Sequence, residues 1–147
     1  MKSSFMVLGT AATLAVMCSI GFVQGQEKQP KREEVNFVSA DEAKFKELLP
    51  GVSQAILWGD HERGPHGTFT KFVPGHDAGM HTHTNDVWIV GIKGAYLYKD
   101  DAGEKRVGPG SFIRIPGGKK HWSGGDAKEG ALFYEESSGK FDTVPAK

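Results

Sequence analysis

Two stretches of the sequence decide the fold: Gly75-His76-Asp77-Ala78-Gly79-Met80-His81-Thr82-His83 and Gly110-Ser111-Phe112-Ile113-Arg114-Ile115-Pro116-Gly117-Gly118-Lys119-Lys120-His121. Side chains alternate between the two faces of an extended strand, so His81 and His83 point the same way. His121 follows a Pro-Gly-Gly turn, where a returning strand can bring it to the first pair. Two imidazoles on one face can hold a divalent metal from one side, and the third can complete the set.

These stretches resemble the two sequence motifs of the cupin superfamily. The first motif is Gly, five residues, His-x-His, three or four residues, Glu, six residues and Gly, and it is matched by Gly75, His81 and His83. The second is Gly, five residues, Pro-x-Gly, two residues, His, three residues and Asn, and it is matched by Gly110, Pro116, Gly118 and His121. The resemblance covers roughly residues 51–144 and implies an all-β cupin fold, a double-stranded β-helix or jelly-roll barrel.

Two positions depart from the cupin pattern. The glutamate position of the first motif falls on Val87, or on Trp88 with the longer gap, and the terminal asparagine position of the second is Gly125. The usual fourth metal ligand of the family is therefore replaced by an apolar side chain.

The strand signal supports the same fold without the family name. Short runs with strand-like composition cover residues 55–58, 68–73, 87–92, 95–99, 112–115 and 131–135. Between them lie Gly- and Pro-containing turns, of which Gly108-Pro109-Gly110 is an example. Many short strands with this punctuation indicate a β-sandwich or a barrel.

A short N-terminal helix is expected before the first strand. Ser39 and Glu42 have the spacing of a capping box. Phe45, Leu48 and Leu49 then form one narrow apolar stripe before Pro50-Gly51 ends the pattern. We expect this helix to pack on the outside of the barrel.

Residues 1–25 are typical of a secretory signal peptide. Lys2 supplies a positive start, residues 5–23 are largely apolar or small, and the segment before Gln26 suits cleavage after Gly25. We therefore expect an exported protein, periplasmic or secreted, with no stable membrane insertion after cleavage. Residues 26–36 are expected to be a flexible tether and residues 37–147 the cupin domain.

Charge and cysteine content exclude some functions. Removal of residues 1–25 takes Lys2 and leaves 17 basic against 18 acidic residues, so no nucleic-acid partner is expected. The only cysteine, Cys18, leaves with the signal peptide, so the mature chain cannot form an internal disulfide. Stability must come from a packed core, a subunit interface or the metal.

The candidate metal ligands are His81, His83 and His121. Three neutral imidazoles suit Fe²⁺ or Zn²⁺ best, and Mn²⁺, Ni²⁺ and Cu²⁺ remain open. Asp86, next to the position of the missing glutamate, is a possible fourth ligand if the chain still turns there. The alternative is that the histidines are strand residues satisfied by neighbouring carbonyls.

Other titratable side chains have weaker signals. One of Glu135 and Glu136 must face inward, whatever the strand register, and either could act as a catalytic base or hold an imidazole. His61, His66 and His76 are expected on surface loops. A basic group near the site mouth either attracts an anionic substrate or only aids solubility; it comprises Arg114, Lys119 and Lys120.

Two functions follow as hypotheses. Loss of the glutamate with all three histidines kept is similar to three-histidine iron dioxygenases of the cupin superfamily, such as acetylacetone-cleaving enzymes, which implies a small chelating oxo or enol substrate. The pattern is also similar to the sensor cupin of a zinc-dependent anti-sigma factor, which implies a non-enzymatic binding module for a metal or small ligand. The aromatic content of so short a chain, together with the resemblance, predicts a homodimer.

Overall fold

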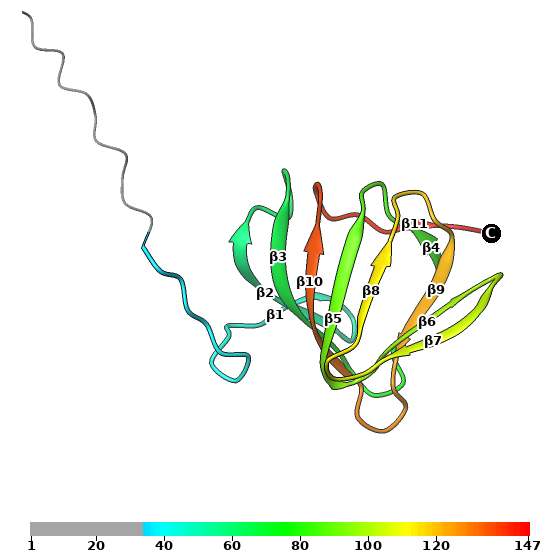
Figure 1. Cartoon of the computed structure of the whole chain (residues 1–147), viewed down its shortest axis with the longest axis horizontal. Coiled ribbons are helices and arrows are strands. Elements are labelled where there is room, and N and C mark those ends of the chain that lie inside the picture. Colours follow the sequence, from blue (N-terminus) through cyan, green and yellow to red (C-terminus); the bar gives the residue numbers. More distant parts are fainter. Residues whose placement is uncertain (1–33) are drawn as a thin grey trace, which may run out of the picture. The chain divides into compact units, whose positions relative to one another are not determined.

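Eleven strands make up the computed structural model over residues 34–147, which are the residues it describes (Figure 1). They are β1 (Lys46–Leu49), β2 (Val52–Gly59), β3 (His66–Phe72), β4 (Asp77–Thr82), β5 (Val87–Gly94), β6 (Tyr96–Asp100), β7 (Gly103–Val107), β8 (Phe112–Ile115), β9 (His121–Gly125), β10 (Ala131–Ser137) and β11 (Val144–Pro145). The signal peptide predicted for residues 1–25 and most of the predicted tether lie outside the described residues.

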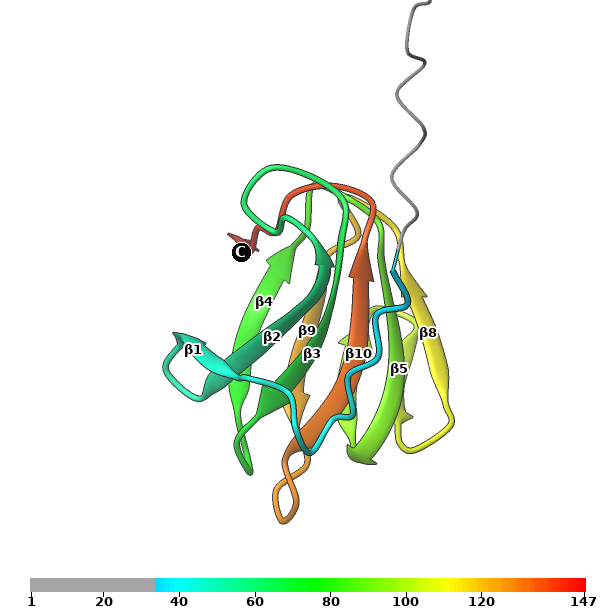
Figure 2. The same ribbon diagram turned by 90° about the vertical axis from the view of Figure 1, so that its left-hand side faces the viewer.

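The strands form two antiparallel sheets that face each other (Figure 2). Sheet A has the order β1-β2-β3-β10-β5-β8, and sheet B has the order β11-β4-β9-β6-β7. This order brings strands that are distant in sequence side by side, as in a jelly roll. The all-β prediction is confirmed, but the barrel is not closed. The edge strands β1 and β8 pair only within sheet A, and β7 and β11 pair only within sheet B.

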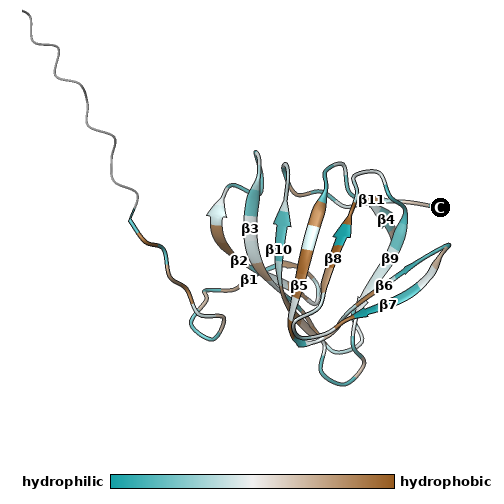
Figure 3. Ribbon diagram, in the orientation of Figure 1, coloured by the Kyte–Doolittle hydropathy of each residue, from teal (hydrophilic) through white to brown (hydrophobic). Residues whose placement is uncertain are grey.

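The core lies between the sheets and follows from strand alternation. In β10, Ala131, Phe133, Glu135 and Ser137 are buried, while the residues between them are partly exposed. Phe133 is fully buried and packs edge-on against Phe72 with ring centroids 5.1 Å apart. Strand β5 is apolar on both faces, which Figure 3 shows as its brown colour. Apolar side chains therefore also remain exposed on the outside of sheet A.

The predicted N-terminal helix is wrong. Ser39 and Glu42 do contact each other, with the Ser39 hydroxyl 3.1 Å from the Glu42 carboxylate, but they close only a single turn. Lys46–Leu49 is strand β1, which pairs with β2 through Lys46 opposite Gln54. A helix this short is marginal on its own, whereas the edge of β2 offers backbone hydrogen bonds to an extended chain.

The six strand predictions from residues 55 to 135 all coincide with observed strands, namely β2, β3, β5, β6, β8 and β10. Strand β7, with the sequence Gly-Glu-Lys-Arg-Val, was not predicted because its charged residues hide the strand signal. Within the described part of the chain, no helix is long and apolar enough to span a membrane.

Candidate metal centre

Three histidines converge between the two sheets because two neighbouring strands hold them. His81 lies near the end of β4 and is paired directly with His121, the first residue of β9. His83 lies two residues beyond His81. One ring nitrogen from each histidine lies within 4.8 Å of the others, and the ring centroids are 4.3–5.3 Å apart. The structure therefore brings together the three histidines that the sequence predicts as metal ligands.

Backbone carbonyls determine the tautomer of all three rings. His81 Nδ1 donates a hydrogen bond to Gly79 O at 2.9 Å, and His121 Nδ1 donates to Lys119 O at 2.9 Å. His83 Nδ1 donates to Asp142 O at 2.7 Å. A carbonyl oxygen can only accept, so each Nδ1 carries the proton and each Nε2 keeps a free lone pair. His121 Nε2 is buried and has no hydrogen-bond partner among the described residues.

This donor set fits a divalent metal ion. Three neutral imidazoles with their other nitrogen fixed by a hydrogen bond are the usual arrangement of ligating histidines. Burial lowers the pKa of His81 and of His83, and it lowers the pKa of His121 to about 4. The rings are therefore neutral near pH 7, which is the form that binds a metal.

A second contact holds the ring of His121. Tyr98 stacks on it with centroids 5.2 Å apart and an interplanar angle of 18°. The Tyr98 hydroxyl donates to Asp100 at 2.9 Å, and Lys119 forms an ion pair with the same carboxylate at 3.0 Å. Hydrogen bonds from Lys119 and Tyr98 lower the pKa of Asp100 to about 2. Lys119 thus has a carboxylate partner beside the ligand residue.

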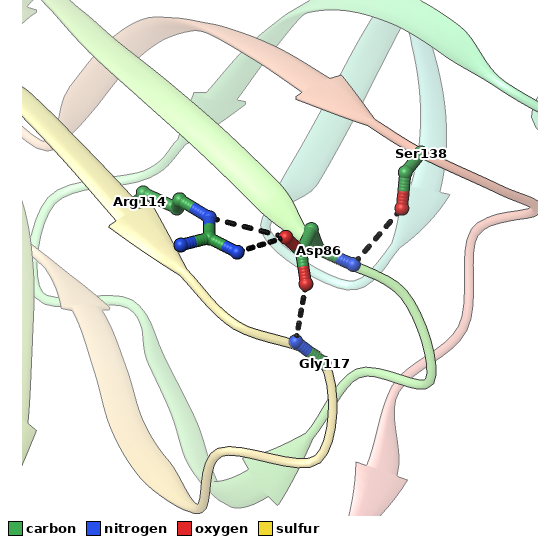
Figure 4. Close-up of polar contacts among 4 residues, drawn as sticks. All are labelled: Asp86, Arg114, Gly117 and Ser138. Atoms are coloured by element: carbon green, nitrogen blue, oxygen red, sulfur yellow. Dashed lines mark hydrogen bonds and ion pairs between the residues drawn. The ribbon is translucent and has the colours of Figure 1, made fainter.

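Asp86, the possible fourth ligand, lies outside this three-histidine group. Its carboxylate accepts hydrogen bonds from Arg114, at 2.6 and 3.1 Å, and from the Gly117 amide at 2.9 Å (Figure 4). Its own amide donates to the Ser138 hydroxyl at 3.1 Å. The Gly117 amide and Arg114 lower the pKa of Asp86, which keeps it ionised. Asp86 therefore joins three loops around the site.

The Pro-Gly-Gly turn is held against the loop after His83. The Gly118 amide donates to His83 O at 2.7 Å, and Gly118 has a positive φ of 75°. A Cβ atom on Gly117 would lie 2.5 Å from Thr84 O, which no side chain can tolerate without a shift. The close contact at Gly117 and the positive φ at Gly118 explain why both residues are glycine. The same contacts connect the turn before His121 to the loop that carries His83.

A segment near the C-terminus completes the support of His83. Besides its carbonyl bond to the ring, Asp142 accepts hydrogen bonds from the Thr84 amide at 2.8 Å and from the Thr84 hydroxyl at 2.5 Å. This role of Asp142 is not predictable from the sequence, because any residue type can supply a backbone carbonyl.

A cavity of about 290 Å³ adjoins His81 and His83 between the sheets. Val87, at the position of the cupin glutamate, is buried and lines it. Glu135 also lines it, is only 7% exposed, and has its pKa raised to about 7 by burial. Glu136 faces away and accepts a hydrogen bond from the Tyr134 hydroxyl at 3.1 Å. Of the two glutamates, Glu135 is therefore the one in the site.

Gln54 and Thr70 also line the cavity, although the sequence pattern does not predict either of them as a site residue. They lie opposite each other on β2 and β3, with Gln54 Nε2 3.3 Å from Thr70 Oγ1. Gln54 was detectable as a polar residue within an otherwise apolar strand, but its inward direction depends on the register of that strand.

The burial of the remaining histidines and the pairing of the basic residues differ in part from the sequence-based expectation. His66 is not on a surface loop: it opens β3 and is fully buried, with Nδ1 3.0 Å from Gly64 O. His61 and His76 are partly buried. Arg114 is paired with Asp86, and Lys120 donates to the Lys147 carbonyl. These cations already have partners.

Comparison with known proteins gives one family match. Residues 33–147 match the family DUF4437, described as a domain of unknown function. No curated protein matches the chain significantly.

Several solved structures share the fold. An RmlC-like cupin from Shewanella frigidimarina is 16% identical with a TM-score of 0.57, covering 71% of this chain and 92% of that one. The polyketide cyclase RemF from Streptomyces resistomycificus is 18% identical with a TM-score of 0.63, covering 78% and 87%. A chain of the Rhodobacter sphaeroides complex of SigE with the anti-sigma ChrR is 18% identical with a TM-score of 0.56, covering 68% and 52%. At these identities the likeness establishes the cupin fold alone.

Proposed function

Because this chain belongs to the DUF4437 family and has the cupin fold, we propose that it is a mononuclear metal-binding cupin that takes a small ligand. The observation that carries the proposal is the group of three neutral histidines, each with Nδ1 hydrogen-bonded and Nε2 free, beside a cavity of about 290 Å³. Fe²⁺ or Zn²⁺ suits such a donor set best. Elemental analysis of protein purified without affinity-tag metals tests the proposal and identifies the ion.

The finer proposal is a dioxygenase that acts on a small chelating oxo or enol compound. A bound divalent ion would supply a Lewis acid for the oxygen atoms of such a compound. The chain supplies neutral imidazoles and, at Val87, no competing carboxylate. Glu135 holds a proton near neutral pH within the same cavity, and so can give it to a ligand oxygen or take one from it. Oxygen uptake by the iron-loaded protein with candidate diketones and phenolic acids tests this proposal.

A second candidate is a non-enzymatic binding module that senses a metal or a small ligand. The fold likeness to a chain of the SigE complex with the anti-sigma ChrR favours it. Zinc in the isolated protein, with no oxygen-dependent turnover of any candidate compound after iron loading, supports this candidate over the dioxygenase.

We also propose that the protein is exported from the cytoplasm. The charged start, apolar run and cleavage sequence of residues 1–25 support secretion to the periplasm or the medium with cleavage after Gly25. Intact-mass measurement of the exported protein tests it: a mass that still includes Met1, or a lipid on Cys18, rejects it.

We also propose a homodimer that buries the outer face of sheet A. Apolar side chains exposed there include Trp58 at 43% and Phe112 at 63%, with Ile56, Val90 and Ile92 on the same sheet. A patch of this kind on a soluble protein usually marks an interface. Sedimentation at micromolar concentration tests it, and a strictly monomeric profile rejects it.

A further inference from the structure

The basic side chains that line the cavity include the histidines His76, His81 and His83, and burial lowers the pKa of each. Among the described residues that line it, none is lysine or arginine. Much of its surface is apolar, with Val52, Phe72 and Ile89 among the contributors. A carboxylate or phosphate that entered the body of this cavity would lose its hydration without gaining a cation partner other than the metal.

One wall of the cavity is polar and lies on sheet A, across from the histidines on sheet B. It consists of Gln54, Thr70 and Glu135, from the neighbouring strands β2, β3 and β10. Gln54 Nε2 lies 3.3 Å from Thr70 Oγ1 and 3.5 Å from Glu135 Oε1. Gln54 Oε1 is buried and has no hydrogen-bond partner among the described residues. We call these three residues the polar wall.

The polar wall keeps two complementary hydrogen-bonding groups for a ligand. Gln54 Oε1 can accept a hydrogen bond. No lysine or arginine lines the described part of the cavity beside Glu135, and burial raises the pKa of this carboxyl to about 7, so it is mostly protonated at pH 6 and can then donate. A hydroxyl group satisfies both at once, because it donates one hydrogen bond and accepts others.

We propose that the ligand of this site is an uncharged, largely apolar molecule that bears a hydroxyl group at the end remote from the metal, where it contacts Gln54 and Glu135. This inference rests on the proposed metal-binding function. Facing sheets pack roughly 10 Å apart, so one six-membered ring is long enough to join a group bound at the histidines to the polar wall. The volume of about 290 Å³ accommodates a single substituted ring.

Three matched probes test the proposal on zinc-loaded protein: benzohydroxamate, 4-hydroxybenzohydroxamate and 4-carboxybenzohydroxamate. All three bind a metal through the same hydroxamate group and differ only at the far end of the ring. We expect the hydroxyl to tighten binding about tenfold relative to benzohydroxamate, as one buried hydrogen bond does, and the carboxylate to weaken it about tenfold or more. Isothermal titration calorimetry at pH 6 measures all three dissociation constants.

Variants then assign the effect to the polar wall. Glu135→Leu and Gln54→Leu should each reduce the preference for the hydroxyl probe to about twofold or less, with zinc content unchanged. Glu136→Gln, on the same strand but on its outer face, is the matched control and should keep the full preference.

The outcomes distinguish failure of the hydroxyl-ligand inference from failure of the proposed small-ligand function. If the hydroxamates bind but the 4-carboxy probe binds as tightly as the 4-hydroxy probe, or if both leucine variants keep the preference, the inference is wrong and the metal-binding function stands. If zinc-loaded protein binds none of the three probes, both the inference and the proposed small-ligand function are rejected.

Discussion

At the scale of the residue, a shift of one position decides whether a carboxyl belongs to the site. Glu135 and Glu136 are adjacent in β10, yet Glu135 is buried in the cavity and Glu136 bonds to Tyr134 on the outer face. The raised pKa of Glu135 follows from this burial, since water no longer stabilises its ionised form.

Glu135→Gln should therefore change how stability depends on pH. The pKa of Glu135 is raised from 4.5 to about 7 in the folded protein, so the wild type loses stability as pH rises from 4.5 to about 7. The loss amounts to roughly 3 kcal/mol and is complete above pH 7. Relative to the wild type, the variant should gain about this amount between pH 4 and pH 9.

Urea unfolding of metal-free protein across that range measures the effect. Glu136→Gln is the control and should follow the wild-type profile. A Glu135→Gln variant whose stability runs parallel to the wild type at every pH would show that Glu135 ionises normally.

Val87→Glu should restore the fourth ligand of the usual cupin site. Val87 lines the cavity with His81 and His83, so a carboxylate there can reach the same ion. We expect zinc affinity to rise about tenfold or more, and any reaction that needs an all-histidine site to fall. Competition with a chromophoric chelator measures the affinity, and Val87→Gln is the uncharged control. Unchanged affinity in Val87→Glu together with its loss in Asp86→Ala would instead make Asp86 the fourth ligand.

The three histidines were predictable because their placement depends on local rules. Alternation along a strand puts His81 and His83 on one face, and the Pro-Gly-Gly turn returns the chain to His121. The carbonyl of Asp142 and the stacking of Tyr98 on His121 were not predictable in this way. They depend on how distant strands are placed against one another, which no local pattern encodes.

Among the secondary-structure elements, the segment before β2 is the one where the local sequence preference for a helix is overridden by strand pairing in the folded protein. The capping-box spacing of Ser39 and Glu42 predicts a helix, but the chain closes one turn and continues as β1 along the edge of β2. Strands β2, β3, β5, β6, β8 and β10 were predictable from composition, because each is rich in apolar, aromatic or β-branched residues. The order of the strands was not, since it is set by pairing across the whole molecule.

The Pro-Gly-Gly turn should be sensitive to one added methyl group. Gly117→Ala places a Cβ atom against Thr84 O, in the loop that follows His83. We expect a loss of about 1–3 kcal/mol in unfolding free energy, together with weaker zinc binding, because the turn and this loop hold His121 and His83. Gly64→Ala is the control: no atom lies within 4 Å of its added Cβ, and it should keep both properties. Equal unfolding free energy and equal zinc affinity in the two variants would show that the turn does not hold His121 and His83 in place.

At the scale of the whole molecule, the two sheets do not close into a barrel, and packing between them holds the site. His81 and His121 come from sheet B, and the loop that carries His83 is tied to the segment after β10 of sheet A through Asp142. An ion bound by all three histidines therefore adds a link between strands β4 and β9 and the C-terminal segment. Binding to the folded state alone raises stability in proportion to the logarithm of metal concentration.

We propose that His81, His83 and His121 together hold one divalent ion, and zinc titration followed by X-ray absorption spectroscopy tests this arrangement. We expect one zinc per chain, with three imidazole nitrogens at about 2.0–2.1 Å. Alanine at any of the three should cut affinity by at least about tenfold, while His76→Ala, a histidine outside the group, should not change it. A stoichiometry near zero, or His121→Ala protein that binds zinc as tightly as the wild type, would contradict the account.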